Sequence, residues 1–202
     1  METFPDRSVI INDRRKSLSE WGKQDSGCYP ELIESPTARY FSRAERSWIS
    51  SIDTALIDYL AGNYPEPRSL TFAVLHGDLA FEQVRLLPDG EVYFFDFGDL
   101  SWGPVAHELA QFLRGFAAEP IPRQRWLDLK AGLLAGYRSE HSLSVADEDA
   151  IEVFLLNRVL AVARYVLELH GNSAAPGGAE VIKQGYRLAA EILHGPHQPQ
   201  QI

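Results

Sequence analysis

VLHGDLAFEQVRLLPDGEVYFFDFGDLSWGPVAHE, residues 74–108, contains two carboxylates that each follow a short apolar run. Residues 70–75 are rich in the residue types of β-strands, and they lead into His76-Gly77-Asp78, where the glycine lacks the Cβ that would block a tight turn. We therefore expect Asp78 to lie just beyond the end of a buried strand.

A β-hairpin is expected after this turn. Residues 84–87 and 92–95 are short strand-like segments on either side of Pro88-Asp89-Gly90, in which the proline fixes φ and the glycine tolerates a positive φ. The second segment runs directly into Asp96-Phe97-Gly98. Two acids separated by one hairpin can converge on a single cation or phosphate group, so Asp78 and Asp96 are the candidate functional residues.

This ordered set of motifs resembles a known family. His76-Gly77-Asp78, Gln83, a hairpin and then Asp96-Phe97-Gly98 are similar to the catalytic loop and the metal-binding loop of the aminoglycoside phosphotransferase and choline kinase family, which is related to the protein kinases. Trp102-Gly103-Pro104 and His107-Glu108-Leu109-Ala110 extend the resemblance, because that family follows its metal loop with a Gly-Pro or Asp-Pro step and a helix that opens on acid-Leu-Ala.

The resemblance implies a role for each matched residue. Asp78 would accept or orient the proton of the attacking hydroxyl, and Asp96 would bind the Mg²⁺ that bridges the phosphates of the nucleotide. His76 would support the catalytic loop from beneath. The residues alone also allow a simpler interpretation, in which Asp78 caps its own turn and Asp96 is a solvated acid at the end of a strand.

Two positions depart from the family pattern. Gln83 stands where the family has Asn, whose amide oxygen binds a second metal ion; Gln keeps the oxygen but adds a methylene, and Mg²⁺ tolerates little error in ligand geometry. Glu108 stands where the family usually has Asp. We expect Glu108 to hold the catalytic loop by hydrogen bonds from the start of a helix, as the resemblance implies.

Residues 1–42 are polar and are predicted to be an irregular N-terminal arm, interrupted by Pro5, Pro30 and Pro36, in which residues 8–11 (Ser8 to Ile11) alone are strand-like. A full family member carries an N-terminal lobe here, with a glycine-bearing loop and a lysine over the phosphates. No glycine-rich loop is present in this segment, and Lys16 and Lys23 have the surroundings of solvated surface lysines. The resemblance therefore implies the C-terminal lobe only.

Helical periodicity dominates the rest of the chain. Trp48, Ile52, Leu56 and Leu60 recur at four-residue steps and predict a buried helix face. The helices are expected at residues 43–62, 105–118, 123–140, 144–170 and 180–193, with a loop at 171–178. The fold class we predict is α+β and mainly α: a kinase-like C-terminal lobe at 43–196 with a small β-hairpin at its active edge, followed by a disordered tail at 197–202.

Composition restricts the class of protein. The chain has 202 residues, 45% of them hydrophobic, and a net charge of −9, which argues against binding to nucleic acid or to an anionic membrane surface. A single cysteine, Cys28, excludes an internal disulfide, and no zinc-ligand spacing is present. Since we find no signal peptide and no apolar run of membrane length, a cytoplasmic protein is expected.

Two functions from different classes follow. The first is transfer of a phosphoryl group from ATP or GTP, with Mg²⁺, to a hydroxyl of a small molecule or peptide. The second is a catalytically inactive kinase-like module that binds a partner protein, which Gln83 and the missing N-lobe lysine favour. A homo-oligomer or a partner protein could cover the face of the missing lobe, and Asp99 or Glu119 could receive a cationic substrate. A hydrolase or lyase built on the same acids is a third, weaker hypothesis.

Overall fold

The structure is a computed structural model, and it describes residues 12–13, 27–116, 123–170 and 176–194. The helices are α2 (Tyr29–Glu34), α3 (Arg43–Asn63), α4 (Val105–Phe116), α5 (Arg123–Glu140), α6 (Val145–His170) and α7 (Pro176–His194). The strands are β1 (Asn12–Asp13), β2 (Phe72–Leu75), β3 (Val84–Leu86), β4 (Val92–Phe94) and β5 (Ser101–Pro104). Short 3₁₀ helices lie at η1 (Pro36–Tyr40), η2 (Pro67–Ser69), η3 (Phe81–Gln83) and η4 (Phe97–Asp99). The predicted fold class, mainly α with a small amount of β, is confirmed.

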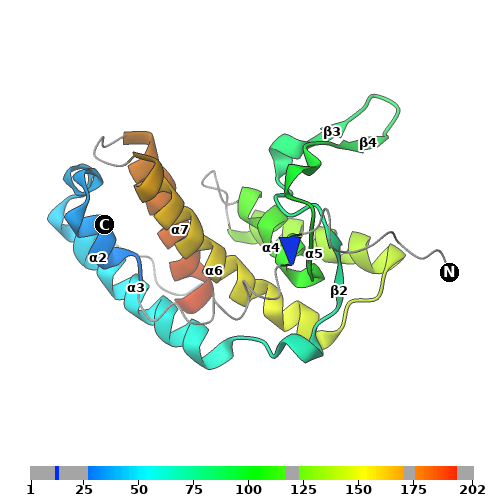
Figure 1. The fold of residues 1–202 in the computed structure, drawn as a ribbon, viewed down its shortest axis with the longest axis horizontal. Coiled ribbons are helices and arrows are strands. Elements are labelled where there is room, and N and C mark those ends of the chain that lie inside the picture. Colours follow the sequence, from blue (N-terminus) through cyan, green and yellow to red (C-terminus); the bar gives the residue numbers. More distant parts are fainter. Residues whose placement is uncertain (1–11, 14–26, 117–122, 171–175, 195–202) are drawn as a thin grey trace.

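The molecule has two halves that share one long helix (Figure 1). Helices α2, α3 and α7 form one half, and the strands with α4 and α5 form the other. Helix α6 crosses from one half to the other, and the hairpin β3–β4 projects away from the body. No helix of the described part has both the length and the apolar character that crossing a membrane requires.

Two small sheets carry the motif region. Strand β2 pairs antiparallel with β5, with Phe72 opposite Pro104 and Leu75 opposite Ser101, and β1 pairs parallel with the other edge of β5. Strands β3 and β4 form the predicted hairpin, with Val84 opposite Phe94. Gly90 in its turn has a φ of +90°, which a glycine adopts without strain.

The sequence of helix α3 explains both where the helix begins and which face is buried. Ser42 and Glu45 make reciprocal side-chain to backbone hydrogen bonds of 3.1 and 2.7 Å, which is a complete capping box. The predicted face is buried at Ile52, Leu56 and Leu60. Ile49 completes this face in place of Trp48, which is only partly buried at the edge of the core.

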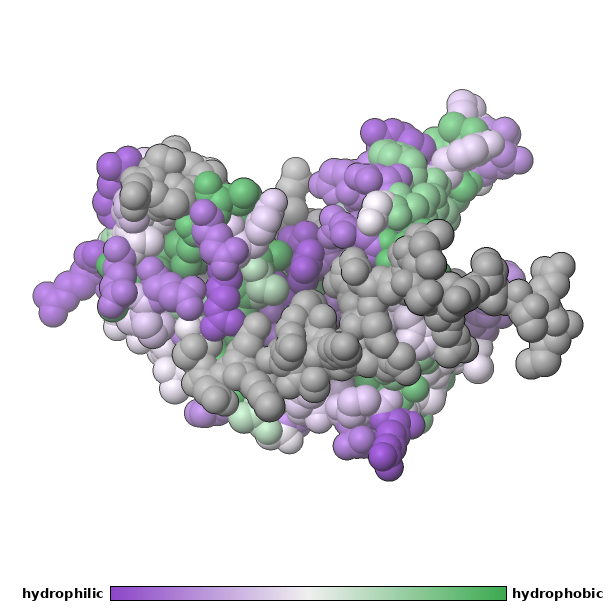
Figure 2. Space-filling view, viewed as in Figure 1, coloured by the Kyte–Doolittle hydropathy of each residue, from purple (hydrophilic) through white to green (hydrophobic). Residues whose placement is uncertain are grey.

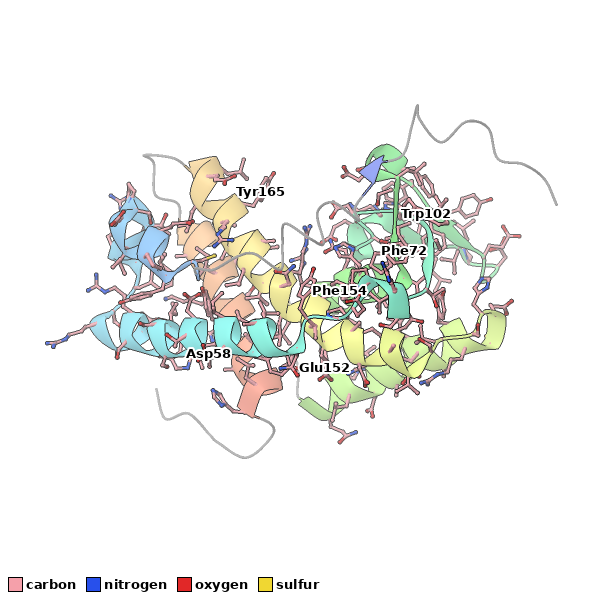
Figure 3. All side chains as sticks on the ribbon, turned by 60° about the horizontal axis from the view of Figure 1, so that its bottom comes forward. Asp58, Phe72, Trp102, Glu152, Phe154 and Tyr165 are labelled. Atoms are coloured by element: carbon pink, nitrogen blue, oxygen red, sulfur yellow. The ribbon has the colours of Figure 1, made fainter. Side chains whose placement is uncertain are left out.

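The core forms around α6. Its residues Ile151, Phe154, Leu155, Leu156 and Leu160 are almost completely buried. Figure 3 shows Phe154 of α6 between the α3 half and the side that carries Phe72 and Trp102. Since α4 and α7 both pack on α6, this helix fixes the position of α4, on which part of the candidate site stands.

The structure differs from the sequence-based expectation where proline begins a helix. Helix α2 starts beside Pro30, η1 starts at Pro36, and α7 starts at Pro176 rather than at residue 180, so residues 27–41 are partly helical and not irregular. Proline is favoured in the first turn of a helix because the N–H that it lacks has no helical partner there. The predictions for residues 8–11, Lys16, Lys23, Glu119 and the tail 197–202 lie outside the described residues.

Candidate active site

The catalytic-loop and metal-loop motifs pack against each other backbone to backbone. Gly77 follows β2 with a φ of +90°, and a Cβ built on it would lie 1.9 Å from the carbonyl oxygen of Asp99. Only glycine fits so close an approach at this φ. The turn that carries Asp78 therefore lies directly against the turn that follows Asp96.

His76 joins the same two loops through its side chain. Its Nε2 lies 2.8 Å from the carbonyl oxygen of Phe95, which can only accept, so Nε2 carries the proton. The imidazole ring also lies 4.7 Å, centroid to centroid, from the ring of Phe97. These contacts place the buried His76 beneath the loop, where it holds the residue before Asp96 and the residue after it.

Glu108 at the start of α4 holds the catalytic loop. Its Oε1 accepts a hydrogen bond of 2.6 Å from the backbone N–H of His76, and its Oε2 accepts one of 3.2 Å from the backbone N–H of Gly77. The hydrogen bonds predicted for Glu108 are therefore present, and a glutamate is long enough to make both.

Asp78 is oriented by side chains of α4 and α6. Its Oδ1 accepts a hydrogen bond of 2.8 Å from Nε2 of Gln111 and lies 3.3 Å from Nη2 of Arg158. The side chain is 45% exposed. Within the described ranges, Oδ2 receives no hydrogen bond, so one oxygen of Asp78 is anchored and the other is open to a ligand.

The hairpin brings Gln83 and Asp96 to the same end. The backbone N–H of Phe95 donates a hydrogen bond of 3.1 Å to the carbonyl oxygen of Gln83, so Gln83 lies across the hairpin from the residue that precedes Asp96. Oε1 of Gln83 is buried without a hydrogen-bond partner among the described residues. Asp96 is exposed, and its φ of 66° is the one positive φ at a non-glycine residue in the described part.

This arrangement is compatible with Mg²⁺. No group of three or more His, Cys, Asp or Glu side chains that could hold a metal ion is present in the residues that the structure covers. Mg²⁺ is commonly held by one or two protein carboxylates together with phosphate oxygens and water. The exposed carboxylate of Asp96 suits such a site, and Gln83, whose amide oxygen has no hydrogen-bond partner among the described residues, lies at the same end of the hairpin. The strained left-handed conformation of Asp96 is typical of residues at functional sites.

Three polar residues near Asp78 were not among the residues singled out in the sequence. Gln111 and Arg114 lie on α4, and Arg158 lies on α6. A signal for the first two is present, since His107, Gln111 and Arg114 follow one another at helical spacing on a largely apolar helix. Arg158 lies 80 residues from Asp78 in the sequence, and no local pattern marks it.

A run of large apolar side chains is exposed along the hairpin and the metal loop. Leu86 is 73% exposed, and Val92, Tyr93, Phe94, Phe95 and Phe97 are exposed as well. Figure 2 shows hydrophobic residues on the projecting hairpin and hydrophilic residues in the hollow between the two halves. A surface of this kind marks an interaction site more often than a bare solvent face.

Solved structures share this fold. An amicoumacin kinase in complex with AMP-PNP, Ca²⁺ and Ami matches 98% of this chain and 55% of its own, at 16% identity and a TM-score of 0.59. A microcompartment-associated aminopropanol kinase matches 96% of this chain and 57% of its own, at 17% identity and a TM-score of 0.62. The chain thus spans little more than half the length of these two proteins. A search of curated proteins found no match.

The sequence also matches a family model. The model of the phosphotransferase enzyme family covers residues 15–147 of the 202, a range that includes the catalytic loop, the hairpin, the metal loop and α4. The chain therefore belongs to the phosphotransferase enzyme family.

Proposed function

We propose that the chain takes part in phosphoryl transfer from a nucleoside triphosphate to a hydroxyl of a small molecule or peptide. The observation that carries this proposal is the contact between the two motif loops, in which Gly77 lies against the carbonyl of Asp99 and His76 binds the carbonyl of Phe95. Phosphoryl transfer through a loose transition state is catalysed by positioning and electrostatic stabilisation rather than by covalent catalysis. Two acids on turns that hold each other in place can supply this positioning.

In this proposal, the two acids have separate tasks. Gln111 and Arg158 hold Oδ1 of Asp78, so that Oδ2 orients the acceptor hydroxyl and accepts its proton. Asp96, with Gln83 at the same end of the hairpin, would hold a Mg²⁺ ion that neutralises charge on the phosphates. The family membership and the two kinase neighbours support the reaction class; the choice of ATP or GTP, of Mg²⁺ and of acceptor is part of the proposal.

Calorimetry tests this function. We expect Mg²⁺-dependent binding of a non-hydrolysable nucleotide by the native chain and at least a tenfold loss of affinity in Asp96→Asn, because a charged metal ligand becomes neutral. Asp89→Asn is the matched control, since Asp89 is also an exposed acid and lies at the other end of the same hairpin. Equal binding by the native chain and Asp96→Asn, or no binding by either, contradicts the proposal.

The second candidate function is a module that binds a partner protein without catalysis. The exposed apolar residues of the hairpin favour it, with Leu86 the most exposed of them at 73%. This candidate predicts that nucleotide binding is absent while light scattering detects self-association or a partner complex. The variant Leu86→Asp would then abolish the association without changing the circular dichroism of the monomer.

A further inference from the structure

Arg114 is a partly buried guanidinium beside the candidate catalytic acid. It lies on α4 three residues after Gln111, on the same face of the helix, and Gln111 binds Asp78 directly. His107 on that face packs its ring 5.8 Å from the ring of Phe154 of α6, so the face is directed toward α6. The catalytic loop passes over this end of α4, since a Cβ on Gly115 would lie 3.3 Å from the ring of Phe81.

Arg114 has no anionic partner at ion-pair distance in the part of the chain that the structure describes, and its buried Nε has no hydrogen-bond partner there. Burial lowers the pKa of this guanidinium, while the carboxylates of Asp78 and Glu82 act in the opposite direction. Those two acids are therefore near enough for their charge to be felt, but neither is bound.

Partial burial makes an unpaired cation unfavourable, and an anion bound to it would compensate for the lost hydration. Asp78 does not fill this role, because among the described residues its carboxylate lies at ion-pair distance from Arg158 and not from Arg114. The chain is acidic, with 19 Lys and Arg against 28 Asp and Glu, so a general excess of basic residues does not account for two arginines, Arg114 and Arg158, near Asp78. The planar guanidinium matches the oxygens of carboxylate and phosphate groups.

We propose that Arg114, with Arg158 on the facing helix, binds an oxyanion beside Asp78. The oxyanion is either an acidic substituent of the hydroxyl acceptor or the phosphoryl group in transfer, and both would lie next to the open oxygen of Asp78. This proposal rests on the proposed function, because it names the charge of the group that the same site accepts.

The test is an anion titration of the nucleotide-free protein, in which the Nε–H signal of Arg114 is monitored by ¹H–¹⁵N NMR. The signal is expected to be observable because the Nε is buried, and the variant Arg114→Lys assigns it by its loss. Glycerate, glycerol and serinol are the acceptor probes, since they share a three-carbon skeleton and differ in carrying an anion, no charge or a cation. Inorganic phosphate is the probe for the phosphoryl group.

We expect a saturable shift with glycerate or with phosphate and none with glycerol or serinol. A response to glycerate alone assigns the site to the acceptor, a response to phosphate alone assigns it to the phosphoryl group, and competition between the two means that one site serves both. Arg114→Gln should weaken binding at least tenfold, read from the backbone amide of Gly115, because a charge-assisted hydrogen bond is lost.

Arg187→Gln is the matched control, because Arg187 is a surface arginine of α7 that pairs with Glu180 at 3.1 Å, and its binding should equal that of the native chain. The proposal is overturned if neither anion moves the Arg114 signal, if glycerol moves it as far as glycerate, or if Arg114→Gln binds as well as the native chain while remaining folded. Anion binding at Arg114 without any nucleotide binding would refute the proposed function and leave the oxyanion site standing.

Discussion

Glu108 accepts a hydrogen bond of 2.6 Å from the backbone N–H of His76, and this bond joins the first turn of α4 to the catalytic loop. The second oxygen of the same carboxylate accepts from Gly77 at 3.2 Å. A single side chain thus satisfies two successive backbone donors in the turn that presents Asp78. The position of that turn therefore depends on a residue of α4, which lies 32 residues after His76 in the chain.

Glu108→Gln should lower the free energy of unfolding by about 1–3 kcal/mol, because the amide NH₂ would face one of the two backbone donors. Urea unfolding followed by circular dichroism measures the loss. Glu108→Asp, which keeps both acceptor oxygens on a shorter side chain, should lose less than Glu108→Gln. An unchanged urea midpoint in Glu108→Gln would show that this carboxylate does not hold the loop.

A comparison of the stabilities of Gly77→Ala and Gly90→Ala distinguishes the effect of a steric clash from that of backbone strain. Both glycines have a φ of +90°, but a Cβ at Gly77 would lie 1.9 Å from the carbonyl oxygen of Asp99, whereas a Cβ at Gly90 meets nothing within 4 Å. We expect Gly90→Ala to lose about 1–2 kcal/mol from strain alone. Gly77→Ala should lose at least twice as much in the same unfolding assay, and similar losses in the two variants would contradict the close approach of the loops.

Asp147 links α6 to the residue that precedes β2, and it makes stability depend on pH. Its carboxylate accepts hydrogen bonds from the backbone N–H and the hydroxyl of Thr71, both at 2.8 Å, and from the hydroxyl of Ser144 at 2.7 Å. Burial acts to raise the pKa of this fully buried acid, but the hydrogen bonds outweigh it, so the pKa lies below the ordinary value of 3.8. Its contribution to stability is therefore present above pH 3.8 and is lost as the pH falls through the lower, folded-state pKa.

Asp147→Asn should lower the free energy of unfolding at neutral pH by about 1–3 kcal/mol, because amide nitrogen replaces an acceptor. The variant should also lose less further stability below pH 3.8 than the native chain does, as measured by urea unfolding across that range. Asp149→Asn is the control, because Asp149 is exposed in the first turns of the same helix. Parallel pH profiles for the native chain and Asp147→Asn would refute this role.

The variant Tyr186→Phe tests the buried hydrogen bonds through which Asp53 of α3 joins the start of α2 to α7. The carboxylate of Asp53 on α3 accepts hydrogen bonds from the backbone N–H of Cys28 at 3.0 Å, from that of Tyr29 at 3.2 Å, and from the hydroxyl of Tyr186 on α7. Burial, above all, raises the pKa of Tyr186, so the hydroxyl stays a donor. We expect a loss of about 1–3 kcal/mol in thermal or urea unfolding, because a buried charge loses a donor.

The control for this link is Tyr165→Phe. Tyr165 is 59% exposed on α6, so removal of its hydroxyl should change stability by less than about 0.5 kcal/mol. Equal stability of the native chain and Tyr186→Phe would mean that the two backbone donors alone are sufficient for Asp53.

The features that the sequence predicted well are those set by neighbouring residues. Pro88-Asp89-Gly90 specifies the hairpin locally, and Ser42 with Glu45 specifies the start of α3. The hairpin in turn places Gln83 opposite Phe95, the residue before Asp96, because the turn fixes the register in which β3 and β4 pair. The order and spacing of the site motifs could therefore be recognised in the sequence.

Features set by distant contacts were not predicted. Gln111 and Arg158 reach Asp78 across 33 and 80 residues, and Asp53 meets Tyr186 across 133. These partnerships depend on how α3, α4, α6 and α7 pack, and no spacing in the sequence encodes that packing. Helix α2, which has Pro30 in its first turn, was missed for another reason, since a proline interrupts a helix in its interior but is favoured in its first turn.

The parallel pairing of β1 with β5 has a practical consequence for anyone shortening the chain. Asn12 lies beside Ser101 and Asp13 beside Trp102, only a few residues beyond Asp99 in the metal loop. A version trimmed to begin after residue 13 would leave the outer backbone groups of Ser101 and Trp102 as an open sheet edge, next to the segment that positions Asp96. Trimming from the front would therefore disturb the end of the molecule that carries the candidate site, although the deleted residues precede every motif matched to the family.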